Sequence, residues 1–98
     1  MRYFLTPLAE SDVRDILEYL RKQDPRAEKR VRGELFAEFR EIGKMPNTGH
    51  RHRDVPDPVV RVRKVYSYLI FYNVEARPVE IYRVLHGKRN IKRIFRKA

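Results

Sequence analysis

The sequence predicts one α+β domain in the order β-α-α-β-β-β, with a helical hairpin packed on one face of an antiparallel sheet. The first observation is the stretch from Val59 to Gly87, where three short runs rich in Val, Ile, Tyr, Leu and Phe are separated by turn-sized gaps. Such residues favour a pleated, partly buried surface, so the runs predict an antiparallel meander. The second is a pair of amphipathic segments before residue 44. The third is the length of 98 residues, which is enough for a single core.

Local signals mark the first strand and the two helices. Residues 2–5 are short and mostly apolar and predict a strand. Thr6-Pro7 and Asp24-Pro25 each combine a capping side chain with a proline at the first helical position, so we expect a helix to begin at each proline. Gly43 is expected to end the second helix in a left-handed cap. Apolar residues recur at helical spacing in both segments: Leu8, Val13, Ile16, Leu17 and Leu20, then Ala27, Val31, Leu35, Phe39 and Ile42.

The strands of the meander differ in their patterns. Valine alternates with arginine at residues 60–63, which predicts a half-buried strand with a basic outer face. Residues 65–72 are almost continuously apolar and predict a central strand, and residues 79–86 form the last strand. Before the meander, residues 45–58 predict a long loop. After it, a short apolar stripe lies on a basic tail: Ile91, Ile94 and Phe95.

The positive charge is concentrated in the second half of the chain. The formal net charge is +10. Residues 1–43 carry nine Lys or Arg and nine Asp or Glu, whereas residues 44–98 carry fourteen and four, so the second segment holds the whole excess. A basic excess confined to one part of a chain favours a polyanionic partner, either nucleic acid or an acidic protein segment. The alternative is a charge that only keeps the protein soluble.

The sequence does not support several classes of protein. There is no cysteine, which excludes disulfides and thiol chemistry and is compatible with a reducing cytoplasm. No apolar run approaches the roughly 20 residues that span a bilayer, and the first residues do not resemble a signal peptide. We therefore expect a cytoplasmic protein without a membrane partner. Because no glycine-rich phosphate loop, Ser-His-Asp set or pair of acids is evident, we predict neither a nucleotide hydrolase nor a protease, and no cofactor.

His86 is the strongest candidate for a catalytic residue, at the end of the last predicted strand. A histidine there could act as general acid or base on a phosphodiester, with Arg61 and Arg83 stabilising the charge that develops on phosphorus. The other interpretation is structural: His86 hydrogen-bonds the backbone at the strand end and orders the following turn. No nucleophile or second acid is evident nearby in the sequence, which favours the structural interpretation.

Further side chains of the loop, the meander and the tail are candidates for binding. A basic surface for an anion or a partner is formed by Arg51, Arg53, Arg61, Arg63, Arg83, Lys88 and Arg89. The loop also holds His50 and His52, but the pair lacks a third ligand and the helical spacing of a zinc site, so we predict no metal. Four tyrosines could stack on bases, although aromatic residues in strands more often pack in the core: Tyr66, Tyr68, Tyr72 and Tyr82.

Five segments spread over nearly the whole chain carry a resemblance to a known family. They are the helix start TPLA, the segment Ile16–Tyr19, the loop GHRHRD, the run VRVRKVYSYLIFY and, most specifically, the strand end IYRVLHGKRNI. Together they resemble the ParE branch of the RelE/ParE superfamily, the toxins of type II toxin–antitoxin modules. The resemblance implies a cytoplasmic bacterial toxin in a hetero-oligomer with a cognate antitoxin. The acidic or amphipathic C-terminal segment of that antitoxin would wrap the toxin and account for its basic excess.

The resemblance leaves two mechanisms open. ParE-like members inhibit DNA gyrase and have no accepted nuclease site. RelE-like members cut mRNA on the ribosome, using basic side chains on the sheet and a tyrosine or histidine near the C-terminus. In this chain Phe95 stands where such a tyrosine is expected, which favours the gyrase-directed mechanism. His86 with Arg61 and Arg83 keeps a ribosome-dependent mRNA endoribonuclease as the alternative. Charge alone would also suit a non-enzymatic basic binding module.

Overall fold

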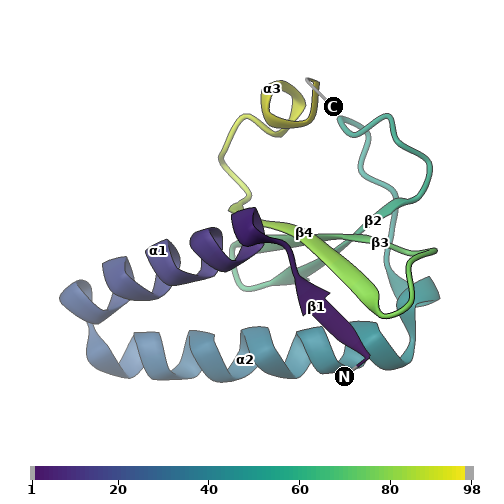
Figure 1. Ribbon diagram of the computed structural model, residues 1–98. Helices are drawn as coiled ribbons and strands as arrows, with labels where there is room; N and C mark the ends of the chain where they lie inside the picture. The colour runs from purple at the N-terminus through teal and green to yellow at the C-terminus, as the bar shows by residue number, and fades with distance from the viewer. Residues whose placement is uncertain (1, 97–98) are drawn as a thin grey trace.

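The computed structural model describes residues 2–96. Its elements follow the predicted order, with a short helix added after the sheet: β1 (Tyr3–Leu5), α1 (Pro7–Gln23), α2 (Pro25–Lys44), the 3-10 turn η1 (Pro46–Thr48), β2 (Val60–Val65), β3 (Tyr68–Asn73), β4 (Val79–His86) and α3 (Ile91–Arg96). Figure 1 shows three layers, with α1 and α2 on one side of the sheet and α3 on the other. Within residues 2–96, no helix has the length and apolar character needed to cross a membrane.

Both predicted helix starts are confirmed, and each has its capping side chain in place. Thr6 Oγ1 accepts a hydrogen bond from the Ala9 backbone N–H at 3.1 Å, and Asp24 Oδ1 accepts one from the Arg26 N–H at 3.0 Å. These bonds satisfy donors that the first helical turn leaves unpaired. Asp24 also ends α1, so a single residue joins the two helices, which lie side by side as a hairpin (Figure 1).

Gly43 does not end α2 in the predicted left-handed cap. The helix continues to Lys44, no glycine among residues 2–96 has a positive φ, and the Met45 N–H still donates to the Glu41 carbonyl in the helical pattern. A Cβ atom at Gly43 would lie 3.0 Å from the Cβ atom of Arg2. The glycine therefore allows α2 to approach the start of β1 closely, a tertiary requirement that the local sequence does not reveal.

The sheet has the strand order β1-β4-β3-β2, so β3 is central, as predicted. β2, β3 and β4 form the predicted antiparallel meander, but β1 pairs with β4 in parallel, with Tyr3 opposite Val79 and Leu5 opposite Ile81. The α+β class is confirmed, whereas the prediction of a wholly antiparallel sheet is wrong for this strand. Tight turns impose antiparallel pairing within the meander. β1 and β4 are far apart in the sequence and no turn connects them, so no local signal sets their relative direction.

The turn between β2 and β3 interrupts the predicted central strand. The apolar run at residues 65–72 predicts one continuous strand, but β2 ends at Val65 and β3 begins at Tyr68. Tyr66 and Ser67 form the connection, and Tyr66 has a positive φ of 53°. Glycine or asparagine usually marks a turn of this kind. Neither is present, so the apolar run contains no sign of the reversal.

The sheet buries both of its faces rather than one. The main core lies between the sheet and the two long helices and includes Leu35, Phe39, Ile70, Tyr72 and Ile81. A second core lies on the α3 side of the sheet and is formed by Val55, Val60, Phe71, Leu85 and Ile91. Because Val60 and Val62 face the second core, Arg61 and Arg63 lie on the side of α1 and α2. The prediction of one buried face and one arginine-bearing face is therefore wrong.

Candidate functional site

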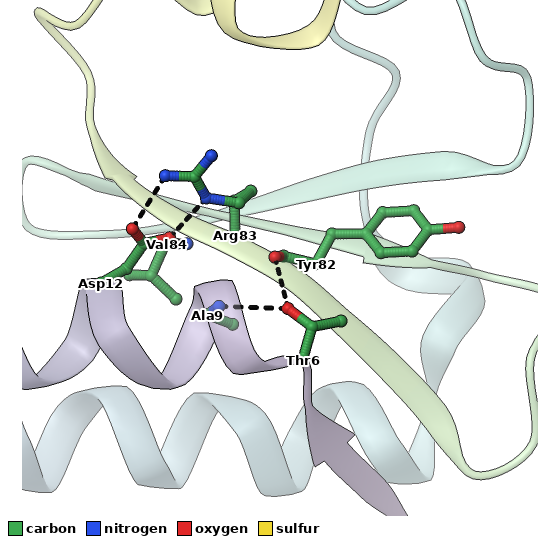
Figure 2. Close-up of polar contacts among 6 residues, drawn as sticks. All are labelled: Thr6, Ala9, Asp12, Tyr82, Arg83 and Val84. Atoms are coloured by element: carbon green, nitrogen blue, oxygen red, sulfur yellow. Dashed lines mark hydrogen bonds and ion pairs between the residues drawn. The ribbon is translucent and has the colours of Figure 1, made fainter. Parts of the chain in front are cut away.

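The start of α1 covers the open outer edge of β4. β1 pairs with β4 only as far as Ile81, so the backbone groups that follow need other partners. Thr6 Oγ1 donates a hydrogen bond to the Tyr82 carbonyl at 2.8 Å. The Asp12 carboxylate accepts one from the Val84 N–H at 2.9 Å. Figure 2 shows these two side chains lying against neighbouring residues of β4 and closing its edge.

Asp12 also binds Arg83 in a bidentate ion pair. Arg83 Nε lies 2.8 Å from Oδ2 of Asp12 and Nη2 lies 2.9 Å from Oδ1, and the two side chains are only 20% and 12% exposed. The hydrogen bonds to Asp12 raise the pKa of Arg83 above its ordinary value, and burial opposes this effect. Arg83 therefore stays charged, with two of its three guanidinium nitrogens held by a structural partner.

His86 lies at the end of β4 and makes the backbone contact that the structural interpretation predicts. Its Nδ1 accepts a hydrogen bond from the Lys88 N–H at 3.1 Å, and its ring meets that of Tyr68 edge-on, with centroids 5.6 Å apart. The Gly87 N–H donates to the Ser67 carbonyl at 2.8 Å. These contacts order the turn after β4, and with Nδ1 as acceptor the neutral imidazole carries its proton on Nε2.

Arg61 and Arg63 lie on the outer strand β2 and have their own partners. Arg61 Nη1 donates to the Pro58 carbonyl at 2.5 Å. Arg63 Nη2 lies 2.6 Å from Oε2 of Glu38 in α2, and these side chains are 28% and 18% exposed. This ion pair connects the edge of the sheet to α2, so Arg63 has a structural role in addition to its partly exposed position.

The three residues considered for phosphodiester cleavage do not converge. Through the pairing of the strands, Arg61 lies beside Tyr72 and His86 lies beside Tyr68. These tyrosines pack in the main core and are four residues apart on β3, which is about 13 Å at the usual rise of a strand. Arg83 instead pairs with a residue of the second core and lies on the α3 side. One phosphate could not meet all three side chains.

An arginine cleft of about 520 Å³ lies between the end of β4 and α3. We use this name for the hollow lined by Arg83, Arg89, Asn90, Arg93, Ile94 and Arg96. A smaller hollow of about 290 Å³ lies between α3 and the preceding loop, where Arg53 and Lys92 join Arg96. Cations thus border α3 on both sides.

The structure separates the basic residues predicted as one surface. Arg83 and Arg89 share the arginine cleft, Arg53 lies at the neighbouring hollow, and the arginines of β2 lie elsewhere. Arg51 and Lys88 are exposed in the loop and in the turn after β4. Sequence reasoning missed Arg93 and Arg96. The spacing of the apolar residues Ile91, Ile94 and Phe95 was the signal that could have found them, because it indicates a short helix. Residues three apart, such as Arg93 and Arg96, lie on the same side of a helix.

An apolar groove of about 390 Å³ lies where the start of α1, β4 and α3 meet. It is lined by Thr6, Leu8, Val55, Pro56, Asp57, Val60, Tyr82, Arg83, Ile94 and Phe95. Leu8 is 59% exposed at this groove, although its spacing in the sequence predicts a core position. A groove that presents apolar side chains to solvent is a candidate for binding a partner.

The loop histidines and the tyrosines make structural contacts. The backbone of His50 forms a bridge with Val62, and His52 Nδ1 accepts a hydrogen bond from the Asp54 N–H at 3.1 Å. Among residues 2–96 no three His, Asp or Glu side chains are arranged to hold a metal ion. Of the four tyrosines, three are buried or partly buried in the sheet and only Tyr66 is exposed, at the β2–β3 turn.

Comparison with known proteins shows the class to which this fold and surface belong. The family model described as "ParE toxin of type II toxin-antitoxin system, parDE" matches residues 3–91. The chain therefore belongs to the ParE toxin family, as predicted. Its fold is similar to a chain of the structure described as "Chromosomal ParDE TA system from P. aeruginosa", with a TM-score of 0.71 and 17% sequence identity over 88% of this chain and 95% of that one. No curated protein matches the sequence.

Proposed function

We propose that this ParE-family toxin acts by inhibiting DNA gyrase and is neutralised by a cognate antitoxin bound to its surface. The observation that carries the gyrase-directed mechanism is the separation of Arg61, Arg83 and His86 over the two faces of the sheet. Cleavage of a phosphodiester needs a proton shuttle and cations within hydrogen-bond reach of one phosphate. Arg83 is instead engaged by Asp12, and His86 by the turn that follows it.

The C-terminal helix supports the same mechanism. Phe95 stands where the ribonuclease members of the superfamily are expected to have a tyrosine. Its ring lies against that of Phe71, with centroids 4.8 Å apart, and it packs on the second core. A phenyl ring has no proton to exchange, so this position contributes packing rather than acid–base chemistry.

The apolar groove and the charge distribution support an antitoxin as partner. The groove can take apolar side chains of an amphipathic segment, while the net positive charge of residues 44–98 attracts its acidic ones. This arrangement fits a hetero-oligomer in which the antitoxin covers the C-terminal side of the toxin. Gyrase and the ribosome both lie in the cytoplasm, where we propose that the protein acts.

A supercoiling assay with purified gyrase tests the proposal. The purified toxin, at micromolar concentration, should block supercoiling or trap cleaved DNA, and prior mixing with the antitoxin from the neighbouring reading frame should restore the activity of gyrase. Ribosome-dependent cleavage of mRNA is measured in parallel. Lack of any effect on gyrase, together with mRNA cleavage that His86→Ala abolishes, would overturn the proposal in favour of the endoribonuclease.

A further inference from the structure

We propose that the arginine cleft binds the phosphate backbone of double-stranded DNA. Four guanidinium groups line the cleft, from Arg83, Arg89, Arg93 and Arg96. Of these four residues, only Arg83 forms an ion pair within residues 2–96, with Asp12. The other three are exposed and have no carboxylate partner among the described residues, so the cleft holds an uncompensated positive charge.

The three exposed arginines are held on an ordered segment rather than on a loose tail. Ile91 is buried in the second core, and Phe95 packs beside it, which anchors α3 to the sheet. Asn90 Oδ1 accepts a hydrogen bond from the Arg93 N–H at 3.1 Å, and the Arg89 N–H donates to the His86 carbonyl at 2.9 Å. Since the backbone is already ordered, binding an anion costs less conformational entropy than ordering a flexible tail.

The chemistry of the lining favours a nucleic acid over an acidic protein segment. Protein partners usually insert apolar or aromatic anchors into a pocket, and this cleft has one apolar lining residue, Ile94. Guanidinium groups match phosphate oxygens with paired hydrogen bonds. The adjoining hollow, which is also lined by Asp54, adds Arg53 and Lys92 to the row of cations. Such a basic band is suited to several successive phosphates and is typical of protein–DNA interfaces.

DNA is also the substrate of gyrase, so the arginine cleft would allow the toxin to contact DNA that gyrase holds. That consequence rests on the proposed function. Binding of DNA to the cleft does not, because it can be measured with the toxin alone. Either proposal can therefore be overturned while the other stands.

The test measures the affinity of the full-length protein for a short fluorescent DNA duplex over a series of salt concentrations. One variant replaces Arg89, Arg93 and Arg96 with glutamine. Its control replaces three exposed arginines of α2, Arg26, Arg30 and Arg40, and so removes the same charge elsewhere. Each lost phosphate contact reduces the magnitude of the slope of log affinity against log salt by about 0.9. The slope of the cleft variant should therefore be smaller in magnitude by about 2.7, and this variant should bind DNA about 10- to 100-fold more weakly at physiological salt.

The control variant should keep the slope of the wild-type protein. A variant with lysine in place of Arg89, Arg93 and Arg96 should keep most of that slope. Circular dichroism melting checks that each variant is folded, and the single Arg93→Gln variant, with an expected slope change of about 0.9, serves if the triple variant unfolds. Equal losses in the cleft and control variants would overturn the proposal, because binding would then follow net charge alone. Unchanged DNA binding with lost binding of a poly-glutamate peptide would overturn it in favour of an acidic protein partner.

Discussion

The Asp12 carboxylate in α1 accepts hydrogen bonds from both Nε and Nη2 of Arg83 in β4, at 2.8 and 2.9 Å, across 71 positions of the sequence (Figure 2). The same carboxylate accepts the Val84 N–H. A single acidic side chain therefore attaches α1 to the sheet edge that β1 leaves open. It also positions one wall of the arginine cleft.

Asp12→Ala should lower the free energy of unfolding by about 2–3 kcal/mol, because it leaves the Arg83 charge and the Val84 N–H without their partner. The value lies below that of a fully buried ion pair, since both side chains keep some contact with water. Urea denaturation measures the change. Asp15→Ala, on an exposed position of the same helix, should change stability by less than about 0.5 kcal/mol. Similar losses in the two variants would contradict the assigned role of Asp12.

Thr6→Ala should cost about 1–2 kcal/mol of stability, because the Thr6 hydroxyl caps α1 and also donates to the Tyr82 carbonyl. Thr6→Ser keeps both hydrogen bonds and should stay within about 0.5 kcal/mol of the wild-type protein. Thermal melting followed by circular dichroism compares the two. A serine variant as unstable as the alanine variant would show that the methyl group, not the hydroxyl, stabilises this edge.

Stability should fall as the pH rises above about 10. Burial raises the pKa of Tyr72 above its ordinary value, and it does the same for Tyr68 and Tyr82. A group whose pKa is higher in the folded state contributes stability below its unfolded pKa, and that contribution is lost as the pH rises through the folded pKa. Denaturation in urea at a series of alkaline pH values measures this loss.

Tyr72→Phe should make the alkaline loss of stability smaller. At neutral pH the same change should cost about 1–2 kcal/mol, because the Pro46 carbonyl loses the hydroxyl that donates to it at 2.6 Å. Tyr66→Phe is the matched control, since Tyr66 is exposed in the β2–β3 turn, and it should change neither quantity. An alkaline curve unchanged by Tyr72→Phe would assign the loss to the other tyrosines.

His86→Ala should leave gyrase inhibition and growth arrest on expression unchanged, because the proposed mechanism gives His86 no chemical role. The stability cost should be about 1 kcal/mol, from the hydrogen bond to the Lys88 N–H and the edge-on contact with Tyr68. Growth curves after induction, with the amount of soluble protein measured in parallel, check this result. A soluble variant that no longer arrests growth would argue for the endoribonuclease. Arg83→Ala is a poorer probe, since it also leaves Asp12 unpaired.

Much of the fold follows from local signals. Thr6-Pro7 and Asp24-Pro25 mark the helix starts correctly because a cap acts on the turn that directly follows it. The last strand has its predicted bounds, residues 79–86, because a proline and turn residues precede it and a glycine follows. The turn at Tyr66 is the exception, since no turn residue interrupts the apolar run there.

The sequence by itself therefore determined the helical hairpin, the meander, the concentration of charge and the resemblance to ParE. Only the tertiary structure decided the direction of β1, the burial of both sheet faces and the positions of the arginines. Alternation along a strand assigns side chains to two faces, but it does not say which element covers each face. Here α3 covers the second face, which turns Arg61 and Arg63 toward the long helices and gathers Arg89, Arg93 and Arg96 beside Arg83. Contacts between distant segments, such as that of Asp12 with Arg83, arise from packing and have no local sequence pattern.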